Sequence, residues 1–318
     1  MIKWILSLLL FAIQIKPVCG ANLDTHSKEL HYRFSFGKLG SGASDFQGPF
    51  GIFISHDNKI YVADDLAHRI QIFNLQGKLL ETIGRKGAGN KEFAWVDKAV
   101  VDKVGNLYVA DTGNDRVQIL DSNYQLIKRF GERGSRPGEF KNPRSIALDS
   151  KANIYVADWE NHRIQVFDQQ GKFLRLFGRA GNGKGAFLNP IAIHIGGDNL
   201  IFVSDFKNHR VQVFDSQESF LYLFGKKGNA EGEFKNPSGL AQDQAGYLYV
   251  ADYDNHRIQI FSKEGRQFVR AFGREGSLAG EFRHPTDLSF DSFGNLYVVD
   301  RGNHRIQVFS PSVMSISE

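Results

Sequence analysis

The chain of 318 residues contains one cysteine and two methionines, and no apolar run reaches the ~20 residues that a membrane-spanning helix needs. Because the cysteine is Cys19, the chain beyond it forms no disulfide and depends on burial and hydrogen bonding for its stability. No segment repeats apolar residues at the helical period over the ~11 positions that identify an amphipathic helix. Glycine and phenylalanine are abundant, with 33 and 27 copies, which favours β-structure with many turns. The 42% hydrophobic and 23% charged content excludes a disordered or collagen-like chain.

The N-terminus has the pattern of a secretory signal peptide. A basic start is followed by 12 mostly apolar residues, Trp4 to Ile15, and by a break at Lys16-Pro17. Small residues then precede Ala21, so we expect cleavage after residue 20 and a secreted or periplasmic protein without a transmembrane span in its mature form. Lipid anchoring at Cys19 is not expected, because Lys16-Pro17-Val18 is a poor match to the small and aliphatic residues that such a site requires.

One sequence unit occurs six times. The run YVADDLAHRIQIF, which begins at Tyr61, returns with small changes at Tyr108, Tyr155, Phe202, Tyr249 and Tyr297. Its aspartates are spaced by 47 residues four times and then by 48. A fixed period of this length is typical of propellers and other repeat architectures.

Each unit contains four strand patterns, which we call a, b, c and d. In the third unit they begin at Pro143, Asn153, His162 and Lys172, with turn residues between them. Four antiparallel strands in each of six units predict an all-β fold, a six-bladed β-propeller.

The sixth unit lacks a strand d, because the chain ends soon after its strand c. The segment LHYRFSFG at residues 30–37 matches strand d and precedes the first strand a. We therefore expect residues 30–37 to complete the last blade and to close the ring without a covalent bond, which removes an open sheet edge. The expected organisation is a signal peptide at 1–20, a lead at 21–29, the propeller at 30–310 and a tail at 311–318.

The string D-x-x-N-H-R-I-Q-V-F, with FG-x-x-G-x-x-x-G-x-F-x-x-P before each strand a, resembles the NHL repeat over about residues 30–310. The resemblance implies a six-bladed propeller that serves mainly as a binding platform for protein, RNA or glycan. Relatives such as the tripartite-motif proteins attach this propeller to ubiquitin-ligase modules, and other relatives are kinases or lyases. This chain has no Cys/His zinc module, so ligase activity is not implied.

An aspartate at the end of strand b and an arginine in strand c recur in every unit. A site that is used once need not be built six times, so we interpret these residues as structural, with the aspartate accepting hydrogen bonds across the b–c turn. The repeated histidines (His68, His162, His209, His256 and His304) lie on different blades and cannot converge on one metal ion. The structural set is Asp64, Asp111, Asp158, Asp205, Asp252, Asp300, Arg69, Arg116, Arg163, Arg210, Arg257 and Arg305.

Positions at which the copies differ are better candidates for function. The b–c and d–a loops emerge on one face, and directly after the strand-b aspartate three consecutive units carry Trp159, Phe206 and Tyr253, and the last carries Arg301. Aromatic residues inside a basic collar suit stacking on sugars or bases, or a protein hot spot; alternatively, they only cover neighbouring turns. The collar is the basic residue that follows the glycine of the d–a loop: Lys38, Arg85, Arg179, Lys226 and Arg274.

The start of strand a sets the mouth of the central channel. The only charged residues there are Asp97, Lys98, Arg144 and Asp287, which either orient a ligand or pair with each other. His194 is the single histidine on a strand a, so a convergent set of metal ligands is not expected.

We therefore expect an exported, monomeric and non-catalytic platform that binds a protein or a polyanionic glycan through the d–a/b–c loop face. No cofactor and no metal are expected. One alternative is a metal-dependent lyase or lactonase that uses the channel, and a second is nucleic-acid binding through the same face. The net charge of +4 falls to +2 when Lys3 and Lys16 leave with the signal peptide, so the bulk field does not drive nucleic-acid binding.

Overall fold

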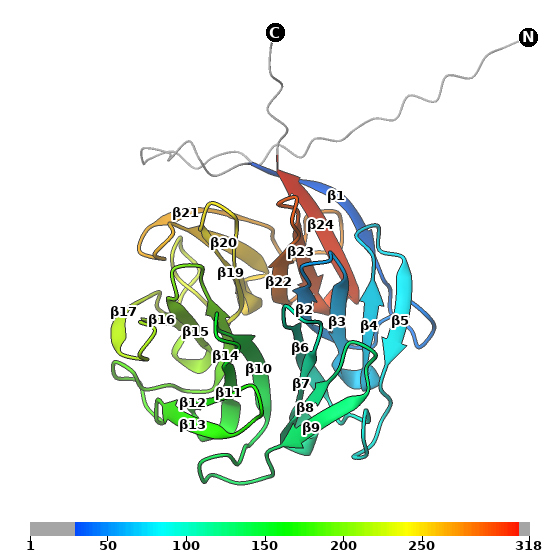
Figure 1. The fold of residues 1–318 in the computed structure, drawn as a ribbon. Coiled ribbons are helices and arrows are strands. Elements are labelled where there is room, and N and C mark those ends of the chain that lie inside the picture. Colours follow the sequence, from blue (N-terminus) through cyan, green and yellow to red (C-terminus); the bar gives the residue numbers. More distant parts are fainter. Residues whose placement is uncertain (1–28, 312–318) are drawn as a thin grey trace, which may run out of the picture.

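The computed structural model describes residues 29–311, and the predicted signal peptide at 1–20 lies outside these residues. The described chain forms six four-stranded antiparallel sheets arranged as blades around a common centre (Figure 1). The predicted all-β fold, a six-bladed β-propeller with four strands per blade, is confirmed.

Each blade follows the predicted order from the inner strand a to the outer strand d. The strands of the first three blades are β2 (Pro49–Ile54), β3 (Ile60–Asp64), β4 (Arg69–Phe73) and β5 (Leu79–Ile83); β6 (Val96–Val101), β7 (Leu107–Asp111), β8 (Arg116–Leu120) and β9 (Leu126–Phe130); and β10 (Pro143–Leu148), β11 (Ile154–Asp158), β12 (Arg163–Phe167) and β13 (Phe173–Phe177). Those of the last three are β14 (Pro190–Ile195), β15 (Ile201–Asp205), β16 (Arg210–Phe214) and β17 (Phe220–Phe224); β18 (Pro237–Gln242), β19 (Leu248–Asp252), β20 (Arg257–Phe261) and β21 (Phe268–Phe272); and β22 (Pro285–Phe290), β23 (Leu296–Asp300), β24 (Arg305–Pro311) and β1 (Leu30–Phe36).

The hydrophobic core is divided among the blade interfaces. The b strands are buried along their whole length, because each lies between two neighbouring blades. Six clusters of buried side chains fill the spaces between consecutive blades, and the inner strands contact each other around the centre. Each blade thus buries its apolar faces against its neighbours, as expected of a repeat that is unstable alone.

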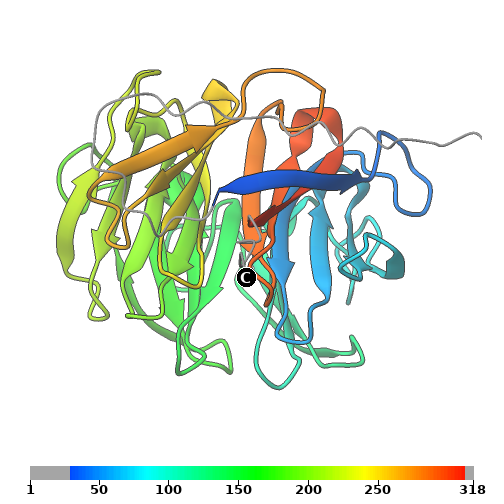
Figure 2. The same ribbon diagram turned by 90° about the horizontal axis from the view of Figure 1, so that it is seen from above.

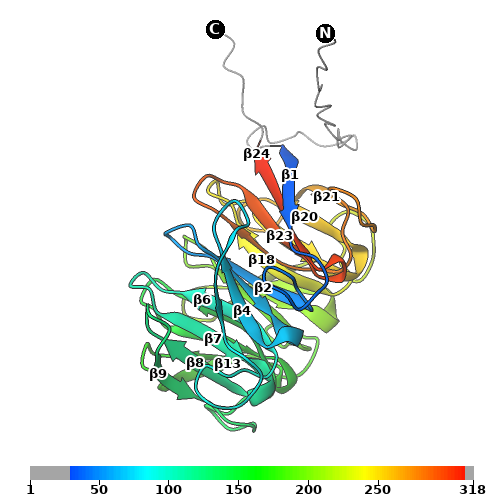
Figure 3. The ribbon, with the colours of Figure 1, turned by 90° about the vertical axis from the view of Figure 1, so that its right-hand side faces the viewer.

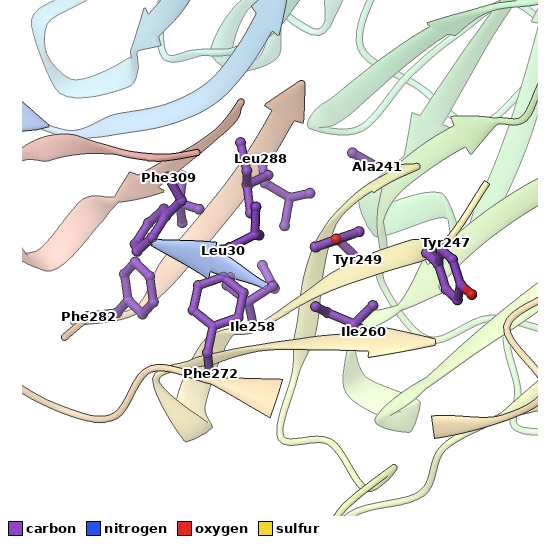
Figure 4. Close-up of a cluster of buried hydrophobic side chains, with 13 residues drawn as sticks. Leu30, Ala241, Tyr247, Tyr249, Ile258, Ile260, Phe272, Phe282, Leu288 and Phe309 are labelled. Carbon is purple, nitrogen blue, oxygen red and sulfur yellow. The ribbon is translucent and has the colours of Figure 1, made fainter. Parts of the chain in front are cut away.

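The ring is closed by β1, which pairs antiparallel with β24, so that the two ends of the described chain lie side by side (Figures 2 and 3). Leu30 of β1 inserts between Phe272 of the fifth blade and Phe309 of the last (Figure 4). Phe34 and Phe36 pack on the opposite side, against the cluster shared by the last and first blades. The predicted non-covalent closure is therefore confirmed.

A single turn of 3₁₀ helix connects strands b and c in every blade. The repeated histidine, or Asp115 in the second blade, ends this turn in the left-handed conformation, with φ between 51° and 56°. The predicted strand c, which began at His162, therefore starts one residue later, at Arg163. The turns are η1 (Asp65–Ala67), η2 (Thr112–Asn114), η3 (Trp159–Asn161), η4 (Phe206–Asn208), η5 (Tyr253–Asn255) and η6 (Arg301–Asn303).

Candidate binding site at the mouth of the channel

The recurrent aspartates and arginines hold the d–a loop onto the b–c turn. In the third blade, Asp158 accepts hydrogen bonds from the Lys141 amide at 2.8 Å, from Nε of Arg163 at 2.7 Å and from Nε2 of Gln165 at 3.0 Å. Arg163 also donates to the carbonyls of Ser135, Arg136 and Glu139. All six aspartates are fully buried and paired with the arginine of their own blade, so neither partner is left to bind a ligand.

Four of the five repeated histidines link neighbouring blades, whereas Nδ1 of His304 has no hydrogen-bond partner among the described residues. Nδ1 of His162 accepts a hydrogen bond from the amide of Asn189, which precedes strand a of the next blade, at 3.1 Å. His68, His209 and His256 do the same. Asp115 takes this place in the second blade, accepting from the Asn142 amide at 2.7 Å. This position needs a side chain that accepts a hydrogen bond and a residue that tolerates the left-handed backbone conformation, and aspartate meets both requirements.

The basic collar is largely neutralised within its own loops. Lys38, Arg85, Lys226 and Arg274 each form an ion pair with the acidic residue seven positions later, at distances of 2.8 to 3.9 Å. Arg179 has Ala186 at that position and no carboxylate partner within residues 29–311. Carboxylates in the same loops therefore offset most of the positive charge of the predicted collar.

The three predicted aromatic residues lie in one row across neighbouring turns. The ring centres of Trp159 and Phe206 are 5.2 Å apart, and those of Phe206 and Tyr253 are 6.0 Å apart. His284 continues the row, 4.6 Å from Tyr253 and 4.5 Å from His256. We call Trp159, Phe206, Tyr253 and His284 the aromatic row.

Two ion pairs and a phenylalanine lie at the mouth of the channel. Arg144 binds Asp97 and Arg301 binds Asp65, each at 2.9 Å. The ring of Phe50 faces both guanidinium groups, at 5.6 Å from Arg144 and 5.0 Å from Arg301. We call these five residues the mouth cluster; its four charges sum to zero when all are ionised.

The mouth cluster and the aromatic row form one site. The guanidinium of Arg144 lies 5.0 Å from the centre of the Trp159 ring. Burial raises the pKa of the Tyr253 hydroxyl, and the nearby charges of Arg301 and Arg144 oppose that shift. The structure thus brings together residues that the sequence had assigned separately to the loop face and to the channel.

Several polar atoms of the mouth cluster are buried without a hydrogen-bond partner among the described residues. They are Oδ1 of Asp65, Oδ1 of Asp97, Nε of Arg144 and Nη1 of Arg301. Asp65 is 5% exposed and Asp97 is 1% exposed. Burial raises the pKa of Asp97 to about 6, although the charge of Arg144 acts in the opposite direction. An unpaired buried polar group costs about 1–3 kcal/mol, so this cluster gains from any water or ligand group that completes its hydrogen bonds.

The other predicted pair, Lys98 and Asp287, lies deeper and narrows the channel. Lys98 Nζ binds the Asp287 carboxylate and the carbonyl of Ile52, and the Ile52 amide donates to the same carboxylate at 2.8 Å. The space between this pair and the mouth cluster is only about 20 Å³. The mouth is therefore a shallow surface site.

Below this constriction the channel widens into a cavity of about 700 Å³ that opens on the opposite face, between the a–b turns. His194 lies in its wall. Within residues 29–311, no three or more His, Cys, Asp or Glu side chains are grouped so that they could hold a metal ion. The described part of the chain therefore offers no set of metal ligands to support the alternative of a metal-dependent lyase.

Sequence reasoning did not select Phe50, Asp65, Trp95 or His284. Phe50 and Asp65 stand at variable positions of the repeat, but their neighbours in space lie on other blades and could not be read from the chain. Trp95 and His284 occupy the position before strand a, where three other blades have asparagine. A comparison of the six copies at that position would have identified both.

Comparison with known families agrees with this fold. A family profile described as a 6-bladed beta-propeller matches residues 51–121 and 148–227, and the NHL repeat profile matches residues 234–261 and 282–309. The chain therefore contains NHL repeats within a six-bladed β-propeller. No curated protein matches the NHL propeller described here. No helix within residues 29–311 has the length and apolar character to cross a membrane.

Solved structures resemble this NHL propeller in fold at low sequence identity. A catalytically inactive virginiamycin B lyase from Staphylococcus aureus, with quinupristin, is 17% identical, with 85% of each chain covered and a TM-score of 0.60. A Bacteroides thetaiotaomicron protein of unknown function is 17% identical over 87% of this chain and 74% of its own, with a TM-score of 0.69. An auxiliary nutrient binding protein from Bacteroides ovatus is 15% identical over 86% and 72%, with a TM-score of 0.64.

Proposed function

We propose that this protein is an exported, non-catalytic platform that binds a protein partner through its d–a/b–c loop face. The observation that carries the proposal is the aromatic row beside a mouth cluster with unpaired buried polar atoms. Clustered aromatic and arginine side chains are the residues that dominate binding energy at protein interfaces. These residues occupy variable positions of the repeat, whereas the invariant polar residues are used in holding the blades together.

Exposed apolar side chains on the same loops favour a protein over a polyanion. Trp95 is 52% exposed, Leu39 is 67% exposed and Leu278 is 68% exposed, and all three lie on loops that lead into strand a. Apolar groups around an aromatic centre are typical of a protein interface. A sulfated or phosphorylated ligand would need free cations, but carboxylates in the same loops neutralise most of the collar.

The similarity to both a lyase and nutrient-binding proteins leaves the fold compatible with catalysis and with binding. We favour binding because residues 29–311 group no set of metal ligands of the kind that a metal-dependent lyase would use.

The test is affinity capture from the exported proteins of the source organism with the double variant Trp159→Ala/Tyr253→Ala. Loss of two aromatic hot-spot side chains, at about 2 kcal/mol or more each, predicts at least a hundredfold weaker binding of the partner at an unchanged melting temperature. The control is Phe293→Ala, which removes a 69% exposed aromatic side chain from the opposite face and should retain the partner.

If wild type, the double variant and Phe293→Ala capture the same proteins equally, the assignment of the binding face is wrong. If the double variant loses a glycan in place of a protein, the face is right and the partner class is wrong.

A further inference from the structure

The cavity at the other end of the channel has the size and lining of a small-molecule site. Its volume of about 700 Å³ lies within the range of roughly 300–1,000 Å³ that is usual for ligand pockets. Residues from the inner strand of every blade line it. The walls are mainly apolar and include Ile52, Ile146, Ile193, Leu240 and Leu288.

His194 presents a hydrogen-bond acceptor in this apolar wall. Nε2 of Gln242 donates to the carbonyls of Gly246 and Lys263, so Oε1 of Gln242 is the atom that faces the histidine. His194 Nε2 lies 3.3 Å from that oxygen and must therefore carry the hydrogen. Nδ1 is then unprotonated and has no hydrogen-bond partner within residues 29–311. Burial lowers the pKa of His194 to about 4, so the ring stays neutral at neutral pH.

The inner strands add two hydrogen-bond donors to this wall. Lys98 uses Nζ to bind Asp287 and the Ile52 carbonyl, which leaves its third N–H without an acceptor among the described residues. Ser289 Oγ accepts from the Ile54 amide at 3.3 Å, and its own hydrogen has no acceptor there. On the inner strands, Asp287 balances the charge of Lys98, and His194 is neutral. The other charged residues of the lining lie in the a–b turns at the rim: Asp102, Lys103, Asp149 and Lys151.

We propose that this cavity binds an uncharged small molecule with an apolar body and a hydroxyl or amide group that donates to Nδ1 of His194. An ionised group held beside His194 would lose its hydration without meeting a free counter-charge on the inner strands, so the site should discriminate against charged analogues. This site is separate from the loop-face platform, and the a–b turns at Asp102–Asn106 and Asp149–Ala152 form its rim.

The test measures binding of 4-phenylbutanamide to the purified protein by ligand-observed NMR and calorimetry. We expect binding of the amide, with 4-phenylbutanoate at least about tenfold weaker because its carboxylate is ionised. Ala147→Phe, which fills the cavity, should abolish binding. Trp159→Ala, on the opposite face, should leave it unchanged and separates this proposal from the proposed function.

His194→Phe keeps the approximate shape of the ring and removes the acceptor. It should weaken binding of the amide about tenfold and change the affinity for butylbenzene, which has no polar group, less than about twofold. The proposal is overturned if the amide does not bind at millimolar concentration, or if it binds Ala147→Phe as well as wild type. Equal weakening of the amide and butylbenzene by His194→Phe would also overturn the assigned role of Nδ1.

Discussion

At the scale of single residues, the aspartates that look alike in sequence differ in what they do. The six repeated aspartates are buried and fully committed to hydrogen bonds within their blade. Asp97 and Asp65 are also buried, but each keeps one carboxylate oxygen without a partner among the described residues. Burial alone therefore does not distinguish the structural aspartates from Asp65 and Asp97. The number of hydrogen-bond partners of each carboxylate does.

The carboxyl group of Asp97 should make the free energy of unfolding depend on pH, whereas an asparagine at this position should not. Its pKa of about 6 in the folded state lies above the ~3.9 of an unfolded chain, so the folded protein holds the proton more tightly. The stabilisation is therefore complete below about pH 4 and is lost as the pH rises through 6, by on the order of 2–3 kcal/mol. Urea unfolding of wild type and Asp97→Asn between pH 4 and 8 should show this difference. A difference that stays constant across this pH range would show that Asp97 does not hold its proton more tightly in the folded protein.

Loss of a repeated aspartate should be costly for the fold. Asp205→Ala leaves Arg210 buried without its counter-charge and the Leu188 amide without an acceptor, which predicts a loss of about 3–5 kcal/mol in the free energy of unfolding. Glu231→Ala removes the same charge from an exposed position and should change that free energy by less than about 0.5 kcal/mol. Equal effects in thermal denaturation would show that the aspartate is not structural.

At the scale of elements, β1 is the strand that closes the ring. Leu30 is 5% exposed and lies between the last two blades, whereas Arg33 in the same strand is exposed. Leu30→Ala should therefore cost about 2–5 kcal/mol, while Arg33→Ala should be nearly neutral. Deletion of residues 22–37 should expose the edge of β24 and cause unfolding or aggregation. A deletion variant that melts like wild type would refute the closure.

At the scale of the whole molecule, the repeat period and the missing last strand were sufficient to predict the architecture, the blade order and the closure. The site was predictable only in part. Trp159, Phe206, Tyr253 and Arg301 stood out because they break the repeat. Their contact with Arg144 and Asp97 depends on side chains that meet across blades. The wide cavity depends on the space between the six inner strands. Neither feature can be read from the spacing of residues along the chain.

We propose that the partner binds the face that bears the aromatic row and the mouth cluster. Hydrogen exchange of the protein with its captured partner, compared with the free protein, tests it most directly. If this face binds the partner, exchange should slow in η3, η4 and η5 and in the adjoining d–a loops, with no change in the a–b turns. Protection confined to the a–b turns at the opposite end would contradict it.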